Sequence, residues 1–115
     1  MSANASGGLG HWKSQRLSSV LLIPLTAWLL WAIIAVAGAD HATAAGFFRA
    51  PFHSVMALLT AAVMVHHAQN GITVVCEDYV SPPGLQSALI WLTRLGCLVG
   101  FLATAYSIYV LWQGA

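Results

Sequence analysis

A histidine, a glycine and an aspartate follow one another along one apolar stretch at spacings that suit one face of a helix. They are His67, Gly71 and Asp78, and Tyr79 comes directly after them. At about 100° per residue, the first three fall within about 40° of one another. At the rise of an α-helix, His67 lies roughly 16 Å along the axis from Asp78. One helical face therefore presents an imidazole, a position without a side chain and, at its end, a carboxylate beside a phenol.

His67 has two interpretations. An imidazole nitrogen is a common axial ligand of haem iron, and an ionisable residue inside a membrane is a candidate functional residue. The alternative is a neutral histidine that is hydrogen-bonded to a neighbouring helix. His66 points about 100° away, so we interpret it as a packing or hydrogen-bonding residue. His53 falls on the same face as His67 but about 21 Å away, where a second haem is a less favoured alternative.

The end of this stretch also has two interpretations. Asp78 and Tyr79 suit an ordinary charge and aromatic residue of a membrane interface. Alternatively, the phenol donates a hydrogen bond to a quinone carbonyl, while the carboxylate holds an arginine or relays protons. Arg16 is a candidate partner for Asp78 or for a haem propionate, or it is an ordinary flanking cation. Arg94 is expected to snorkel toward the surface or to contact a partner subunit, and it receives no site role.

Composition places these residues in a membrane protein. The chain has 115 residues, of which 59% are hydrophobic and only 6% are charged. A soluble domain carries roughly 25% charged residues, so lipid must surround most of this surface. The formal net charge is +1, and the few basic residues form no stripe of the kind that binds nucleic acid. The two cysteines are too few for a disulfide framework.

Three apolar segments are long enough to cross a hydrocarbon core of about 30 Å, which takes about 20 helical residues. Backbone groups in lipid must be satisfied within the segment, so we expect helices. The prediction is an all-α integral membrane protein, with an N-terminal segment at residues 1–16 and a three-helix transmembrane domain at 17–115. The expected spans cover residues 17–39, 51–76 and 85–112.

The connections between the spans are also predicted. Residues 40–50 should form a short polar loop, and Ser81–Gly84 should break the chain before the last span. Lys13 and Arg16 precede the first span, whereas the first loop holds one arginine offset by one aspartate. The positive-inside rule therefore favours a cytoplasmic N-terminus, with Asp78 and Tyr79 on that same side.

Two motifs resemble a known family. His67-x-x-x-Gly71 followed by Val75-x-x-Asp78-Tyr79-Val80 is similar to the second-helix signature of the smaller cytochrome b anchor subunits of succinate dehydrogenase. Gly10-His11-Trp12-x-x-Gln15-Arg16-Leu17-Ser18 resembles the entry to the first helix in alphaproteobacterial members. The resemblance covers nearly the whole chain, although the first and third spans match only as hydrophobic segments.

The resemblance implies a role for each matching residue. His67 would be one axial ligand of a b-type haem, and the larger anchor subunit would supply the other. Tyr79 would hydrogen-bond ubiquinone near the cytoplasmic surface, with Asp78 beside it. Arg16 would face the quinone site or the haem propionates, and Gly71 would allow the haem to approach the backbone.

The resemblance also implies partners and a location. The flavoprotein subunit would oxidise succinate to fumarate, and the iron–sulfur subunit would pass electrons to the quinone. This chain would be a non-catalytic subunit in the bacterial inner membrane. Gln69 and Asn70 are more polar than the residues that usually flank the glycine, and the neighbouring His66 leaves the choice of ligand open.

Two other functions remain as alternatives. An independent membrane b-type cytochrome would need a second pair of histidines at a suitable depth. A small structural or transport protein would need no cofactor. Transport is disfavoured because no Asp or Glu lies within a predicted span.

Overall fold

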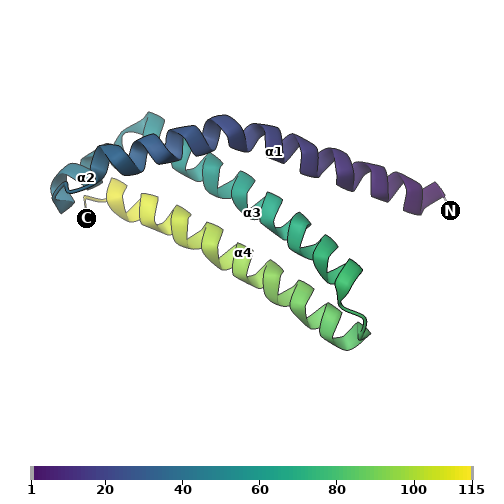
Figure 1. The fold of residues 1–115 in the computed structure, drawn as a ribbon. Coiled ribbons are helices and arrows are strands. Elements are labelled where there is room, and N and C mark those ends of the chain that lie inside the picture. The colour runs from purple at the N-terminus through teal and green to yellow at the C-terminus, as the bar shows by residue number, and fades with distance from the viewer. Residues whose placement is uncertain (1, 115) are drawn as a thin grey trace.

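The computed structural model describes the backbone of residues 2–114 and the side chains of residues 9, 10 and 12–114. The prediction of an all-α protein is confirmed, because the described residues form helices and short connections. Three of the helices are long, and α3 lies between α1 and α4, antiparallel to both (Figure 1). Within the described residues α1 and α4 have no close backbone contact with each other. The four helices are α1 (Ser2–Val36), α2 (His41–Arg49), α3 (Pro51–Tyr79) and α4 (Pro83–Trp112).

Helices α3 and α4 contain the predicted spans at residues 51–76 and 85–112, whereas α1 ends at Val36, three residues before the predicted end of the first span at residue 39. Helix α1 is continuous across the expected boundary after Arg16, and α3 continues past its expected end at Cys76 to Tyr79. Helix α4 begins at Pro83, since proline is well accommodated in the first helical turn. Hydropathy thus marks the apolar part of each helix, whereas the helix ends depend on backbone hydrogen bonds and caps.

The prediction of a polar loop at residues 40–50 is wrong, because most of it forms α2. Asp40 starts this helix as its N-cap and accepts a hydrogen bond from the Thr43 amide at 2.8 Å. The hydrogen bonds from the Thr43 side chain and backbone hold the pKa of Asp40 below its ordinary value. Helix α2 ends because Ala50 precedes a proline and leaves the helical region, with φ −59° and ψ 132°. Helices α2 and α3 meet there at a bend of 82°.

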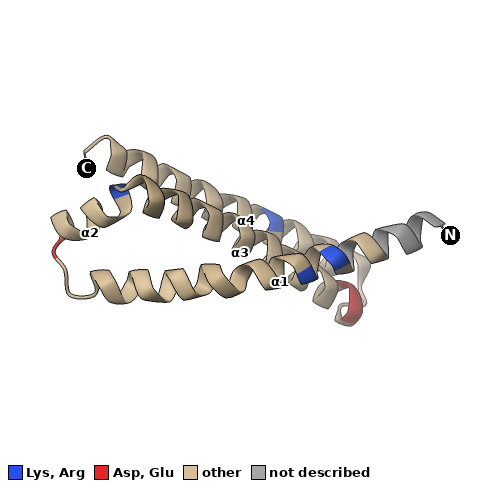
Figure 2. Ribbon diagram, turned by 90° about the horizontal axis from the view of Figure 1, so that it is seen from above, with Lys and Arg blue, Asp and Glu red and all other residues tan. Residues whose placement is uncertain are grey.

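Large apolar side chains cover the outside of the bundle. Ile23 and Ile34 of α1 are 70% and 73% exposed, and no residue of α4 is buried. The stretches Trp12–Val36 and Pro83–Trp112 are each long and apolar enough to cross a membrane, and α2 with α3 forms a third, bent candidate. Most of the length of the helices carries no charged residue, and the charges lie mainly toward the two ends, with one basic residue further along α4 (Figure 2). This distribution is typical of a protein whose middle section is surrounded by lipid.

Candidate functional site

Polar side chains of α1 and α3 meet where these two helices pack together. We call this set the α1–α3 polar cluster. Small hydroxyl residues allow two helices to approach closely and supply hydrogen bonds that lipid cannot. The cluster consists of Ser14, Gln15 and Ser18 on α1 and of His66, His67, Asn70 and Gly71 on α3.

His67 is held by the most deeply buried residue of the cluster. Nδ1 of His67 lies 2.9 Å from the hydroxyl oxygen of Ser18, and Ser18 is only 3% exposed. The same hydroxyl donates to the backbone carbonyl of Gln15 at 2.9 Å, one helical turn earlier. The described residues provide no hydrogen-bond partner for Nε2 of His67.

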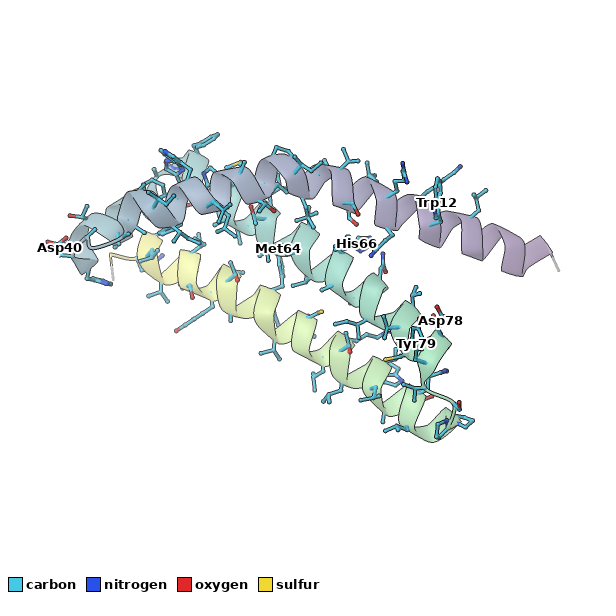
Figure 3. All side chains as sticks on the ribbon, in the orientation of Figure 1. Trp12, Asp40, Met64, His66, Asp78 and Tyr79 are labelled. Carbon is cyan, nitrogen blue, oxygen red and sulfur yellow. The ribbon has the colours of Figure 1, made fainter. Side chains whose placement is uncertain are left out.

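His66 belongs to a separate set of contacts. Its Nε2 lies 2.6 Å from the Ser14 hydroxyl and 3.2 Å from Nδ2 of Asn70. The Asn70 amide also donates to the Ser14 hydroxyl, at 3.4 Å. Figure 3 shows His66 on the side of α3 that faces α1. The two histidines therefore use different ring nitrogens toward different serines.

Gly71 lies against the side chain of Gln15. A Cβ atom built at Gly71 would lie 3.3 Å from Nε2 of Gln15, which is a tight contact. Oε1 of Gln15 is buried and has no hydrogen-bond partner among the described residues. The missing side chain of Gly71 thus accommodates an amide of α1, and that amide keeps one acceptor unused.

The sequence alone predicts no site role for the residues of α1 that complete this cluster. Ser14 and Ser18 are four residues apart, so they fall on one helical face. Two serines at this spacing at the start of an apolar segment are the signal that could have found them. Their partners on α3 could not be predicted, because the register between two helices depends on how their surfaces pack.

Asp78 and Tyr79 lie in the last turn of α3, away from the polar cluster (Figure 3). Tyr79 is 81% exposed. Asp78 is also exposed and forms no ion pair with any described residue, Arg16 included. The guanidinium of Arg16 lies over the Trp12 ring instead, at 5.5 Å from its centroid. The structure therefore does not bring Arg16 and Asp78 together within this chain.

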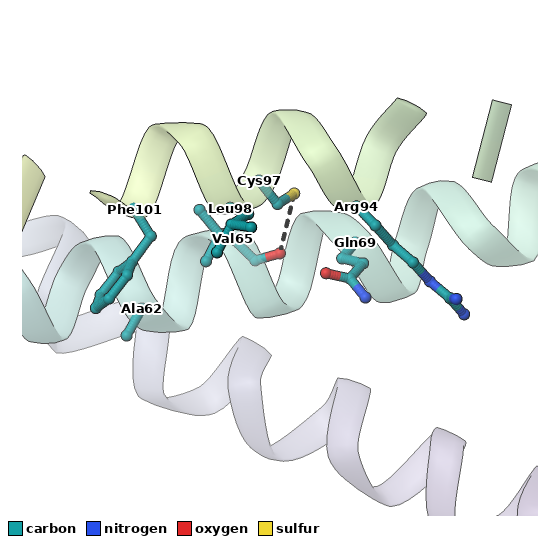
Figure 4. Close-up of a pocket in the computed structure, with 7 residues that line it drawn as sticks. All are labelled: Ala62, Val65, Gln69, Arg94, Cys97, Leu98 and Phe101. Atoms are coloured by element: carbon teal, nitrogen blue, oxygen red, sulfur yellow. Dashed lines mark hydrogen bonds between the residues drawn. The ribbon is translucent and has the colours of Figure 1, made fainter. Parts of the chain in front are cut away.

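Arg94 lies beside a groove between α3 and α4 (Figure 4). The groove has a volume of about 310 Å³, and Gln69 lines it together with apolar side chains. The Cys97 thiol donates to the Val65 carbonyl at 3.6 Å on its floor. The Arg94 guanidinium lies 5.1 Å from the Trp91 ring centroid. Arg94 is therefore an exposed cation beside the groove between α3 and α4, whereas the polar cluster lies between α1 and α3.

His53 lies in an aromatic cluster near the start of α3. Its Nδ1 accepts a hydrogen bond from the indole N–H of Trp28 at 3.2 Å. Its ring stacks on Phe47 with centroids 4.0 Å apart and planes 12° apart, and Trp31 lies 5.6 Å away. These contacts give His53 a packing role and do not favour a second haem beside it.

The fold and the polar cluster together define a class of protein. It is a small helical membrane protein of several apolar helices that carries a histidine site between two of them. Polar groups at such a position are costly in lipid and are usually retained for binding or transfer.

The family follows from comparison with known proteins. A family model described as "Succinate dehydrogenase/Fumarate reductase transmembrane subunit" matches residues 3–109. The chain belongs to this family, which confirms the resemblance found in the sequence.

Individual relatives agree with this assignment, and they are named as membrane anchor subunits of succinate dehydrogenase. The protein of Rickettsia typhi is 29% identical over 108 residues, which cover 94% of this chain and 86% of that protein. The protein of Rickettsia felis is 31% identical over 104 residues, with coverages of 90% and 87%. The protein of Reclinomonas americana is 29% identical over 91 residues, and 76% of each chain is covered.

Proposed function

We propose that this chain is the smaller membrane-anchor subunit of a succinate:ubiquinone oxidoreductase. It lies in the bacterial inner membrane with a cytoplasmic N-terminus and has no catalytic activity alone. Its partners are the larger cytochrome b anchor subunit, the iron–sulfur subunit and the flavoprotein subunit that oxidises succinate. The family match over nearly the whole chain and the apolar exterior of the helices support this proposal.

His67 contributes one axial ligand to a b-type haem in this proposal. The observation that carries this assignment is the hydrogen bonding of the two imidazole nitrogens. Nδ1 is engaged by Ser18, whereas the described residues leave Nε2 without a partner. Bound haem would accept and release single electrons. In this proposal the larger anchor subunit supplies the second axial ligand.

The alternative ligand, His66, fits less well. The amide nitrogen of Asn70 can only donate a hydrogen bond, so Nε2 of His66 accepts and its lone pair is already used. Iron ligation through that nitrogen would break the contacts with both Asn70 and Ser14. The contacts on this helix therefore favour His67.

Gly71 on α3 and Arg16 on α1 support the haem site. Gly71 allows α1 to pack closely, with Gln15 in the space beside it, and thereby keeps Ser18 against His67. The buried, unpartnered Oε1 of Gln15 suits a donor brought by the cofactor or by the partner subunit. Arg16 is exposed beside Trp12 and is free of any carboxylate among the described residues, so it can face a haem propionate or the quinone site.

Tyr79 and Asp78 form this chain's part of the ubiquinone site. Both side chains project from the last turn of α3, where a partner subunit can approach them. The Tyr79 phenol donates a hydrogen bond to a quinone carbonyl, and the Asp78 carboxylate beside it accepts or relays a proton. Their exposure supports a site that is completed by other subunits.

An independent dihaem cytochrome is less well supported. Such a protein would need histidines that face each other within one chain. Among the described residues, His53 is packed against Trp28 and Phe47, and His66 is bonded to Ser14 and Asn70.

The proposal is tested by the reduced-minus-oxidised visible spectrum of the purified native complex that contains this chain. We expect a b-type signal that is lost or shifted in His67→Ala and kept in His66→Ala. Loss of the signal in His66→Ala alone would reverse the ligand assignment. A complex that shows no b-haem at all would contradict the haem assignment and leave Tyr79 and Asp78 to carry the quinone site.

A further inference from the structure

Ser18 makes two hydrogen bonds, although its hydroxyl carries a single proton. The oxygen lies 2.9 Å from the Gln15 carbonyl oxygen and 2.9 Å from Nδ1 of His67. A carbonyl oxygen can only accept, so the contact with Gln15 uses the hydroxyl proton. The contact with His67 must then use a proton on the imidazole. Nδ1 of His67 is therefore the protonated nitrogen, and Nε2 carries the lone pair.

We propose that Ser18 is a positioning residue that fixes His67 in the Nδ1–H tautomer and directs the free lone pair of Nε2 to an axial bond with haem iron. This inference rests on the proposed role of His67 as a haem ligand. Histidines that bind a metal usually donate their second N–H to an acceptor, which fixes the ring orientation and raises the basicity of the ligand. Ser18 is suited to this task because it is 3% exposed and is itself held by its own helix.

The neighbouring histidine shows why the partner matters. His66 also has a serine beside it, Ser14, at 2.6 Å. There the contact is made by Nε2, and the Asn70 amide donates to that same nitrogen. The lone pair of His66 is thus used in accepting hydrogen bonds, whereas Nδ1–H of His67 donates to its serine and leaves the lone pair on Nε2 free. Ser18 therefore accounts for the difference between two adjacent histidines that the sequence alone left open.

Ser19 provides a matched control in the same turn of α1. Its hydroxyl donates to the same Gln15 carbonyl, at 2.8 Å, but Ser19 is exposed and forms no hydrogen bond with any histidine whose side chain is described. Ser19→Ala removes an equivalent side chain-to-backbone hydrogen bond from the same helix. It therefore tests the effect of losing a serine without the effect on His67.

The experiment compares Ser18→Ala, Ser18→Thr and Ser19→Ala in the purified native complex. The measurements are the reduction potential of the b-haem, its low-spin ferric EPR spectrum and its rate of loss to apomyoglobin. In Ser18→Ala we expect a higher potential, because a less basic imidazole stabilises ferric iron less. We also expect an altered EPR spectrum and roughly tenfold faster haem loss. Ser18→Thr keeps the hydroxyl and should restore the wild-type values, and Ser19→Ala should not change them.

The inference is wrong if Ser18→Ala matches the wild type in all three measurements, or if Ser19→Ala gives the same change. Should Ser18→Ala fail to assemble, Ser18→Cys replaces it, since a thiol has a similar size and is a weaker acceptor. His67→Ala distinguishes the two proposals. An unchanged haem in His67→Ala contradicts the haem role itself, whereas loss of haem there with an unchanged Ser18→Ala contradicts only the role of Ser18.

Discussion

Nε of Arg49 donates a hydrogen bond to the backbone carbonyl of Leu111 at 2.6 Å and so joins the end of α2 to the last turn of α4. The two residues are 62 positions apart in the chain. The Leu111 carbonyl also accepts the Gly114 amide at 3.1 Å, so Arg49 adds a second hydrogen bond to this acceptor. The positive charge of Arg49 also interacts favourably with the helix dipole. The contact fixes one end of the bundle, far along α3 from Asp78 and Tyr79.

Arg49→Leu should loosen the end of α4. A hydrogen bond to a charged group contributes about 1.5–3 kcal/mol, and its loss should fall on the last helical turn. Hydrogen exchange of the amides at residues 109–113 in the purified complex should become faster, while exchange near His67 stays unchanged. Arg49→Lys keeps the charge and should retain part of the protection. Equal protection in Arg49→Leu and the wild type would show that the contact does not stabilise the helix end.

Asp40 makes the stability of α2 depend on pH. The hydrogen bonds from Thr43 hold the pKa of this carboxyl below its ordinary value of 3.8. A group whose pKa is lower in the folded state contributes stability above its unfolded pKa and loses it as the pH falls through its folded pKa. Protection of the α2 amides should therefore decrease when the pH is lowered below about 4. Asp40→Asn keeps a capping acceptor without a charge and should show no such decrease over the same range.

Gly71→Ala should be less favourable than the same change at another helical glycine. Replacing glycine by alanine inside a helix stabilises it by up to about 1 kcal/mol. At Gly96 nothing lies within 4 Å of the added Cβ, so that gain should be realised. At Gly71 the Cβ meets Gln15 at 3.3 Å, and the contact should offset the gain. Thermal unfolding of the two variant complexes measures the difference, and equal unfolding temperatures would mean that Gln15 moves away without cost.

Tyr79→Phe should weaken the reduction of ubiquinone and leave the oxidation of succinate by a soluble acceptor unchanged. Loss of one hydrogen bond of about 1 kcal/mol corresponds to a decrease of roughly five- to tenfold in kcat/KM for the quinone. Tyr109→Phe removes a similarly exposed phenol near the far end of α4 and serves as the control. Equal quinone kinetics in Tyr79→Phe and Tyr109→Phe would exclude a role for the Tyr79 hydroxyl.

Trp28→Phe should leave the haem unchanged although it removes a hydrogen bond to a histidine. The indole of Trp28 donates to Nδ1 of His53, and phenylalanine keeps the ring contacts but not the donor. We expect a loss of about 1 kcal/mol in stability and an unaltered b-type spectrum. A changed spectrum would point to a cofactor beside His53, which the one-haem proposal does not contain.

The amino-acid sequence by itself determined the class of the protein and the placing of its candidate site residues along α3. Seven charged residues in 115 are too few for a water-exposed surface, and backbone groups in lipid must be paired within helices. The spacing of His67, Gly71, Asp78 and Tyr79 follows from the geometry of a single helix. Such properties need no knowledge of the neighbouring helices, and the family match agrees with them.

Only the tertiary structure decided what lies opposite those residues. The apolar pattern did not reveal α2, because its start depends on the local cap at Asp40 and its end on the proline after Ala50. The apolar pattern also did not predict that Ser18 contacts His67 or that Ser14 contacts His66. Those pairs depend on the register in which α1 packs against α3, and that register is set by the shapes of two surfaces far apart in the chain. The different states of the two histidines are therefore a property of the packed helices and not of the sequence around them.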